Sequence, residues 1–149
     1  MQQAVDHLRY QRTANLLGYL GLLPFAGLTL LLFADVHPAL VVDALRFYAA
    51  TILVFVGAIH WGTSLYSGNV ADALVSVAVA LYAWLCLMFG EVTSLLGLTA
   101  GFVGIYIHDR DRYRDLMPWF VKLRRNLTLV VSTSLMISVG WLVFRSDAI

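Results

Sequence analysis

Three ionisable residues stand out in this sequence because they lie inside or at the ends of long apolar runs. His60 lies within Ile59-His60-Trp61-Gly62-Thr63-Ser64, about two turns before an apolar stretch ends. Asp72 begins the following stretch and Asp109 ends the next one. A buried imidazole or carboxylate needs a hydrogen-bonding or charged partner. We therefore predict that His60 faces a protein interior and bonds a neighbouring side chain or a bound molecule.

Several partners fit these residues. Asp72 and Asp109 can each pair with His60 or with the arginines that follow Asp109, and a carboxylate at the Asp72 position is also favoured by a helix N-terminus. A neutral, packed His60 that bonds a Ser, a Thr or a carboxylate is the simpler interpretation. A haem with two histidine ligands is disfavoured, because the other histidines lie at other depths: His7, His37 and His108.

Sequence motifs for catalysis are missing. The chain has no Walker loop, HExxH, GxSxG or CxxC motif. The single Cys86 falls in an apolar run, so neither a disulfide framework nor a thiolate metal site is expected. We expect no enzymatic activity, no cofactor and no metal.

The composition indicates which solvent surrounds these residues. The chain has 149 residues, of which 60% are hydrophobic and 13% charged, and its mean hydropathy is +0.80. Such values do not fit a water-soluble globule, and a net charge of +1 gives no reason to expect nucleic acid. We predict an all-α membrane protein, with residues 1–149 forming a single membrane domain whose polar first twelve residues precede an uncleaved anchor.

Five apolar segments are long enough, or nearly so, to cross a bilayer as helices. They cover about 13–34, 44–66, 70–89, 93–108 and 127–144. Five spans place the termini on opposite sides of the membrane. The side that holds the N-terminus would then carry most basic residues, namely Arg9, Arg12, Arg110, Arg112, Arg114, Lys122, Arg124 and Arg125. Only Arg46 and Arg145 fall on the other side, so the positive-inside rule predicts N-in, C-out.

Small residues four apart predict where these helices approach one another. Such pairs are Ala58 and Gly62, Gly97 and Gly101, and the hydroxyls of Ser134 and Ser138. Gly62 would thus admit a close neighbour, and Trp61, about 100° further round the helix than His60, would fill the adjoining crevice. Pro24 lacks a backbone donor and should kink the first span.

The segment before the last span differs from the others. Residues 108–115 alternate in charge and read as a solvated loop, and an amphipathic interfacial helix is predicted over about 116–126. Pro118, Trp119 and Phe120 would anchor it at the interface. Lys122, Arg124 and Arg125 would face anionic phospholipid headgroups.

Two short motifs resemble a known family. These are Phe55-Val-Gly-Ala-Ile-His60-Trp61-Gly62 and Leu116-Met-Pro118-Trp119-Phe120-Val-Lys-Leu123-Arg124-Arg-Asn-Leu127-Thr128, together with an Asp after the fourth span. The combination resembles the domain-of-unknown-function membrane family that includes mitochondrial transmembrane protein sixty-nine. The resemblance covers about residues 10–145 and implies an energy-coupling membrane, either the bacterial inner membrane or, as the alternative, the mitochondrial inner membrane. It assigns no activity.

Two classes of function remain open. The first is an accessory, assembly or interaction subunit of an inner-membrane complex, respiratory complexes included, with other membrane subunits and lipid as partners. The second is a module that binds a small, quinone-like ligand or relays protons through His60. A solute transporter is disfavoured, since no inverted repeats are visible.

Overall fold

The structure is a computed structural model that describes residues 2–146, with side-chain surroundings from Leu8 onward. It contains six helical segments, α1 (Gln2–Leu20), α2 (Leu23–Phe33), α3 (Pro38–Ser67), α4 (Val70–Leu87), α5 (Glu91–Tyr113) and α6 (Pro118–Ser146). Within the described residues, five stretches are long and apolar enough to cross a membrane, and α1 with α2 supplies the first. The predicted all-α bundle with five candidate spans is confirmed.

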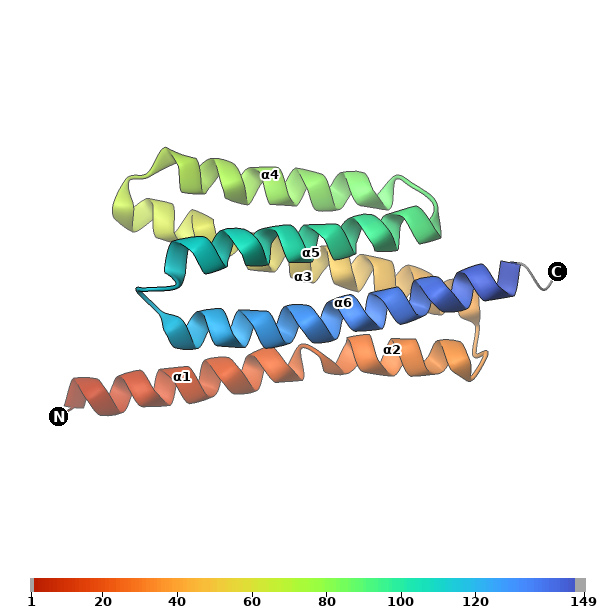
Figure 1. Ribbon diagram of the computed structural model, residues 1–149, viewed down its shortest axis with the longest axis horizontal. Coiled ribbons are helices and arrows are strands. Elements are labelled where there is room, and N and C mark those ends of the chain that lie inside the picture. The colour runs from red at the N-terminus through yellow and green to blue at the C-terminus, as the bar shows by residue number, and fades with distance from the viewer. Residues whose placement is uncertain (1, 147–149) are drawn as a thin grey trace.

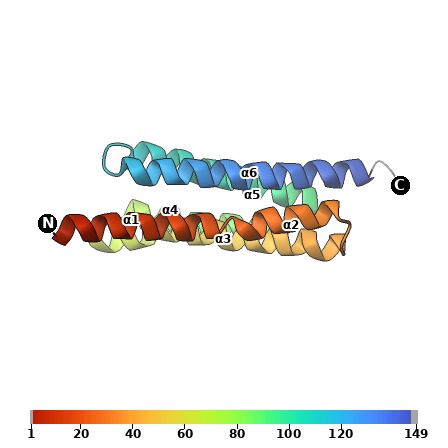
Figure 2. The same ribbon diagram turned by 90° about the horizontal axis from the view of Figure 1, so that it is seen from below.

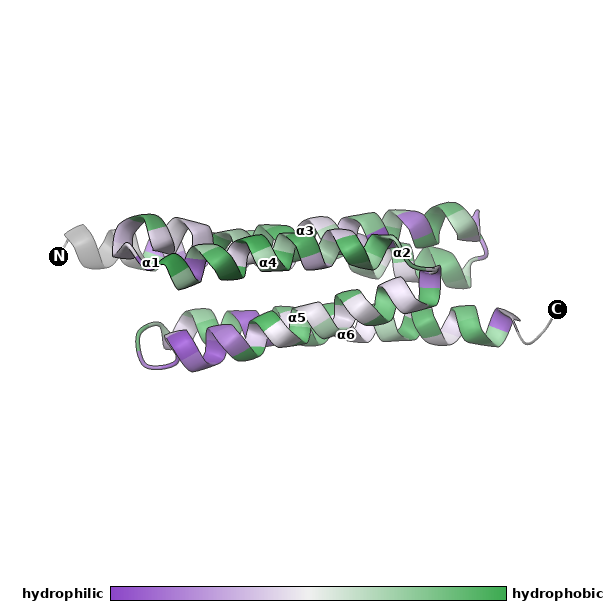
Figure 3. Ribbon diagram, turned by 90° about the horizontal axis from the view of Figure 1, so that it is seen from above, coloured by the Kyte–Doolittle hydropathy of each residue, from purple (hydrophilic) through white to green (hydrophobic). Residues whose placement is uncertain are grey.

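The helices run side by side in two layers (Figures 1 and 2). Helices α5 and α6 form one layer, and α1 to α4 form the other. The two termini lie at opposite ends of the bundle. One end holds the start of α1, the α3–α4 turn and the α5–α6 loop, and the hydrophilic residues of α5 and α6 gather there (Figure 3). We call this the basic end, because the eight basic residues named above belong to it, and we call the other the opposite end.

The first span is interrupted near Pro24, where the sequence predicted a kink. α1 ends at Leu20 and α2 begins at Leu23, with Pro24 in the first turn of α2. Proline has no N–H with which to continue the helical ladder. The hydroxyl of Tyr48 on α3 donates to the carbonyl oxygen of Gly21 at 2.9 Å and so satisfies a backbone acceptor at the break.

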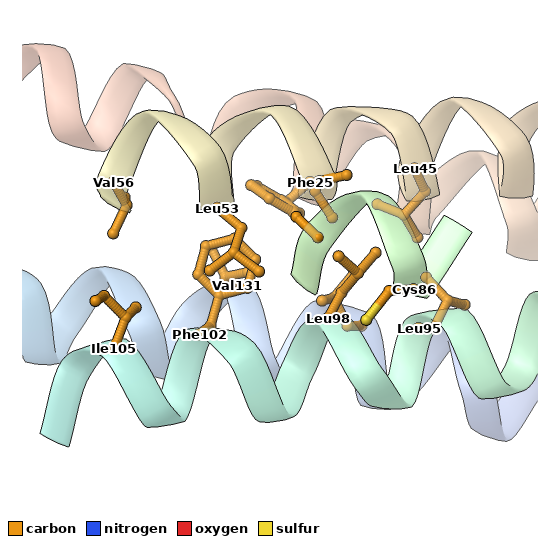
Figure 4. Packing of buried hydrophobic residues seen from close by; sticks show 14 of the residues in the cluster. Phe25, Leu45, Leu53, Val56, Cys86, Leu95, Leu98, Phe102, Ile105 and Val131 are labelled. Carbon is orange, nitrogen blue, oxygen red and sulfur yellow. The ribbon is translucent and has the colours of Figure 1, made fainter. Parts of the chain in front are cut away.

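The middle of the bundle is an apolar core. Phe25 of α2, Leu53 of α3, Phe102 of α5 and Val131 of α6 meet there (Figure 4). Gly101 allows this approach, because a Cβ on it would lie 2.7 Å from a methyl carbon of Leu53. The close contact predicted for the Gly97 and Gly101 pair is therefore confirmed.

Three boundaries differ from the sequence prediction. α3 begins at Pro38, six residues before the predicted start, and α5 continues to Tyr113 through residues expected to form a loop. The segment predicted as a separate interfacial helix over 116–126 is helical from Pro118 but continuous with the last span as α6. No proline follows Pro118 to interrupt the hydrogen-bond ladder. The α5–α6 loop is consequently short, and the two helices stay paired up to the basic end.

Candidate functional site

A cluster of ionisable side chains lies inside the bundle near the basic end. Asp109 on α5 accepts a hydrogen bond from His60 Nε2 of α3 at 2.8 Å through Oδ1. Its other oxygen, Oδ2, accepts from Arg124 Nε of α6 at 2.7 Å. All three side chains are buried, with His60 completely inaccessible. We call these three residues the triad.

The α5–α6 hairpin explains why Asp109 and Arg124 meet. Asp109 lies one turn before the end of α5 at Tyr113, and Arg124 lies in the second turn of α6. The intervening residues 114–117 reverse the chain, so these two turns run antiparallel and level with each other. α3 passes beside α5 at the same height and brings His60 to the other oxygen of the carboxylate.

Asp109 and Arg124 can be buried in apolar surroundings because their charges are paired. An isolated carboxylate or guanidinium is strongly disfavoured away from water, whereas a hydrogen-bonded pair of opposite sign is tolerated. Asp109 and Arg124 neutralise each other, and both oxygens of Asp109 have donors. Because a carboxylate only accepts hydrogen bonds, the His60 hydrogen that faces it lies on Nε2.

Three buried nitrogens around the triad have no partner among the described residues. They are His60 Nδ1, Arg124 Nη2 and His108 Nε2. The rings of His60 and His108 lie 5.0 Å apart between centroids. A buried polar atom left unpaired typically costs about 1–3 kcal/mol.

Aromatic rings close the triad towards the end of the bundle. Tyr113 stacks on His60 with centroids 6.0 Å apart, and Phe120 contacts Tyr113 edge to face at 5.6 Å. Trp119 contacts both Phe120 and Tyr10. Trp119 and Phe120, which the sequence predicted to be interfacial anchors, contact rings of α1 and α5, while Pro118 is exposed and begins α6.

Asp72 belongs to a second ion pair beside the triad. It is buried and accepts a hydrogen bond from Arg112 of α5. The side chain of Asn69, rather than that of Asp72, caps α4 by accepting from the Ala71 N–H. The sequence left open whether Asp72 and Asp109 pair with His60 or with the arginines. In the structure Asp109 bonds both His60 and Arg124, and Asp72 bonds Arg112.

The structure contradicts three site predictions. Arg124 does not face headgroups, because its bond to Asp109 holds it inside the bundle while Lys122 and Arg125 are exposed. Trp61 fills no crevice, since α3 turns it outward and 50% of it is exposed. Gly62 has no close neighbour, because a Cβ there would meet nothing within 4 Å. The tight contact of α3 is made by Gly57 against Val79 of α4 instead.

The proximity of His108 to His60 was missed in the sequence. His108 appeared to lie at the water boundary, because the residues from 108 onward were expected to leave the helix. The side chain of His7 lies outside the described residues, and His37 immediately precedes α3 at the opposite end. Among the described residues no group of three or more His, Cys, Asp or Glu side chains is arranged to hold a metal ion.

Five candidate spans around a buried, carboxylate-centred ion-pair cluster define a polytopic helical membrane protein. A family model described as a protein of unknown function (DUF3429) matches residues 10–140, and the chain belongs to that family. Transmembrane protein 69 of Xenopus tropicalis is 32% identical to it over 147 residues, which cover 88% of this chain and 58% of that protein. The chain thus spans less than two thirds of the length of this relative. No solved structure matches the chain.

Proposed function

We propose that this protein is an accessory or assembly subunit that binds other integral membrane proteins of an inner-membrane complex and catalyses no reaction itself. The observation that carries the proposal is an exposed face of small residues on α5. Ala100 and Gly104 lie one turn apart and are both exposed. A Cβ on Gly104 would meet nothing within 4 Å.

This face borders a groove between α3, α4 and α5. The groove has a volume of about 450 Å³, and Ala78, Tyr82, Ala100 and Gly104 are among its lining residues. In a bilayer, apolar surface gives no net drive for association, and helices pair where small residues allow their backbones to approach. A transmembrane helix of a partner subunit fits this requirement at Ala100 and Gly104.

The two small-residue stripes of α5 have different neighbours. Gly97 and Gly101 lie against Cys86, Tyr82 and Leu53 of the same chain. In the neighbouring stripe, which has the same spacing, Ala100 is exposed and a Cβ on Gly104 would meet nothing within 4 Å. This difference supports a helix of another protein as the neighbour of Ala100 and Gly104.

A photo-crosslinking amino acid at position 104 tests the proposal. We expect an adduct with one defined membrane protein, and we expect Gly104→Leu to remove that protein from material purified in mild detergent. Gly27 on α2 is the matched control, because it is also an exposed helical glycine with nothing within 4 Å. Equal adducts at positions 27 and 104, or undiminished co-purification of Gly104→Leu, would contradict the proposal.

The proposal includes an orientation and a location. The basic end would face the cytoplasm of a bacterium, with the chain in the inner membrane, or the matrix if the membrane is that of a mitochondrion. The concentration of eight basic residues at this end supports it. A cysteine introduced at Asn69 should react with an impermeant thiol reagent from the cytoplasmic side, and one at Ser146 from the outer side. Reaction of both from one side would rule out the topology.

A further inference from the structure

A recess lies at the opposite end of the bundle, where α2 and α6 both end (Figure 1). It has a volume of about 290 Å³ and shares no lining residue with the groove beside α5. Its lining residues are aromatic, aliphatic or charged, namely Leu32, Phe33, Asp35, Trp141, Phe144 and Arg145. A carboxylate and a guanidinium therefore share a recess whose other lining side chains are aliphatic or aromatic.

Trp141 gives the recess a fixed wall. Its ring packs against the buried cluster of Leu32, Val41 and Val42. The guanidinium of Arg145 lies over the same ring, 4.9 Å from the centroid. The face of an indole attracts a cation, so Trp141 holds the charged end of Arg145 at the recess.

Asp35 occupies a backbone position at which glycine is usual. α2 ends in a Schellman motif, in which the N–H groups of Asp35 and Val36 bond carbonyl oxygens of the last turn of the helix. The residue that follows the helix cap in this motif has a positive φ, and the φ of Asp35 is 53°. Aspartate tolerates this conformation better than most residues do. The turn therefore places a carboxylate within reach of Arg145, to which it is bonded.

Both charged groups remain accessible to a ligand. The side chains of Asp35 and Arg145 are 64% and 45% exposed, and their contact joins one carboxylate oxygen to Nη1 of the guanidinium. A guanidinium has five N–H donors and a carboxylate has two acceptor oxygens. A molecule that carries both signs of charge can bond both residues at once. An anion alone would be repelled by Asp35, and a cation alone by Arg145.

We infer that this recess binds a phospholipid whose headgroup carries both a phosphate and a primary ammonium. Arg145 donates to the phosphate, and Asp35 accepts from the ammonium. The acyl chains lie against Phe33 and Phe144, whose side chains are 62% and 83% exposed. A lipid suits the recess better than a soluble zwitterion, because two candidate spans end here, at Phe33 and at Ser146. The recess is thus at the level of the headgroups, where indole rings such as that of Trp141 are enriched.

The lipid expected here differs from the lipid expected at the basic end. Exposed Lys122 and Arg125 on α6 favour an anionic headgroup there. In the recess Asp35 balances the charge of Arg145, so a headgroup without net charge fits better. This inference depends neither on the docking face of α5 nor on the orientation of the bundle.

Native mass spectrometry of the whole chain in detergent tests the inference. The protein is titrated with phosphatidylethanolamine or with phosphatidylcholine that has the same acyl chains. Both headgroups are zwitterionic, but the choline nitrogen carries three methyl groups and has no N–H to donate. We expect the ethanolamine lipid to bind about five-fold more tightly, which is the ratio that corresponds to about 1 kcal/mol, the upper value for an exposed ion pair.

Asp35→Asn isolates the carboxylate. Asparagine keeps the shape of the side chain and tolerates the positive φ, but it has no charge, so the preference for the ethanolamine lipid should disappear. Asp43→Asn is the matched control, because Asp43 is 48% exposed and also pairs with an arginine at this end but does not line the recess. It should leave the preference unchanged. The double change of Lys122 and Arg125 to Gln at the basic end should also leave it unchanged.

Three results would overturn the inference. Equal affinity of the unmodified protein for the two lipids decides the matter even if a variant fails to fold. A folded Asp35→Asn protein that keeps the preference would show that the carboxylate does not bind the ammonium. An equal reduction by Asp43→Asn would show that the effect is not specific to the recess. Crosslinking at position 104 is measured separately, so failure of the docking proposal and failure of this inference are distinguishable.

Discussion

The two ends of the bundle handle their charged residues differently. At the basic end, Asp109 and Arg124 are buried and bind each other across two helices, with His60 from a third. At the opposite end, Arg46 pairs with Asp43 on the same helix and donates to the carbonyl oxygens of Leu87 and Phe89 at the end of α4. The difference is that the ion pair at the basic end joins two helices through buried side chains, whereas the pair at the opposite end lies within one helix and its arginine bonds backbone carbonyl oxygens at the end of another.

The largest effect should follow Asp109→Ala. This change leaves Arg124 buried without its carboxylate and removes the acceptor of His60. Removal of one partner from a buried ion pair typically destabilises a protein by about 3–5 kcal/mol. We expect greatly reduced accumulation in the membrane and a lower melting temperature in detergent.

A double variant sharpens this result. Asp109→Leu combined with Arg124→Leu replaces the pair with apolar groups, which is often neutral or stabilising in a protein interior. The double variant should therefore accumulate better than Asp109→Ala. Equal loss in both would mean that the charges themselves, rather than the unpaired guanidinium, are needed for the fold.

His60→Leu should have a smaller effect on stability. It removes one hydrogen bond to Asp109, but Arg124 still pairs with the carboxylate, so a loss of about 1–3 kcal/mol is expected. A functional role for His60 predicts that the folded variant loses partner or ligand binding in addition to this loss of stability. Unchanged binding by the folded variant would indicate packing alone.

Removal of surface charges at the basic end should lower the binding of anionic phospholipid rather than the stability of the protein. Lys122 and Arg125 are exposed on α6, and a basic residue near anionic headgroups contributes about 1 kcal/mol to membrane attraction. The double change Lys122→Gln and Arg125→Gln, with Arg124 intact, should lower the anionic phospholipid that co-purifies without changing the melting temperature. Mass spectrometry of bound lipid checks this, and unchanged retention counts against the headgroup contact.

The smallest effect is expected at the opposite end. Arg145 and Asp35 form an ion pair whose side chains are 45% and 64% exposed. Solvent screens such pairs, and they typically contribute about 0–1 kcal/mol. Asp35→Asn should change the melting temperature little. A decrease in melting temperature as large as that of Asp109→Ala would contradict the conclusion that the ion pairs at the two ends differ in their contribution to stability.

The apolar segments determined most of the fold. A bilayer accepts only helices whose backbone groups bond one another, so five apolar stretches predicted five spans. The break at Pro24 was equally predictable, because a missing N–H acts locally. The family resemblance drawn from His60, Trp61, Gly62 and the Pro118 segment was also confirmed, by the family match over residues 10–140.

The site depended on helix ends and rotations that the sequence did not reveal. Alternating charges over 108–115 suggested a loop, yet α5 remains helical to Tyr113. Two of its charged residues have partners of opposite sign on neighbouring helices, because Arg112 pairs with Asp72 of α4 and Asp109 pairs with Arg124 of α6. The extension of α5 places His108 next to His60, and the bond to Asp109 holds Arg124 inside the bundle.

Sequence alone therefore determined which residues belong in the membrane and that His60, an ionisable group at that depth, needed a polar partner. Only the tertiary structure decided which partner it has. Apolar length and a missing N–H are properties of one segment and can be read along the chain. The choice between Asp72 and Asp109, and between an inward and an outward Arg124, depends on how three helices are rotated against one another, and that rotation is set by close contacts such as Gly57 on Val79 and Gly101 on Leu53.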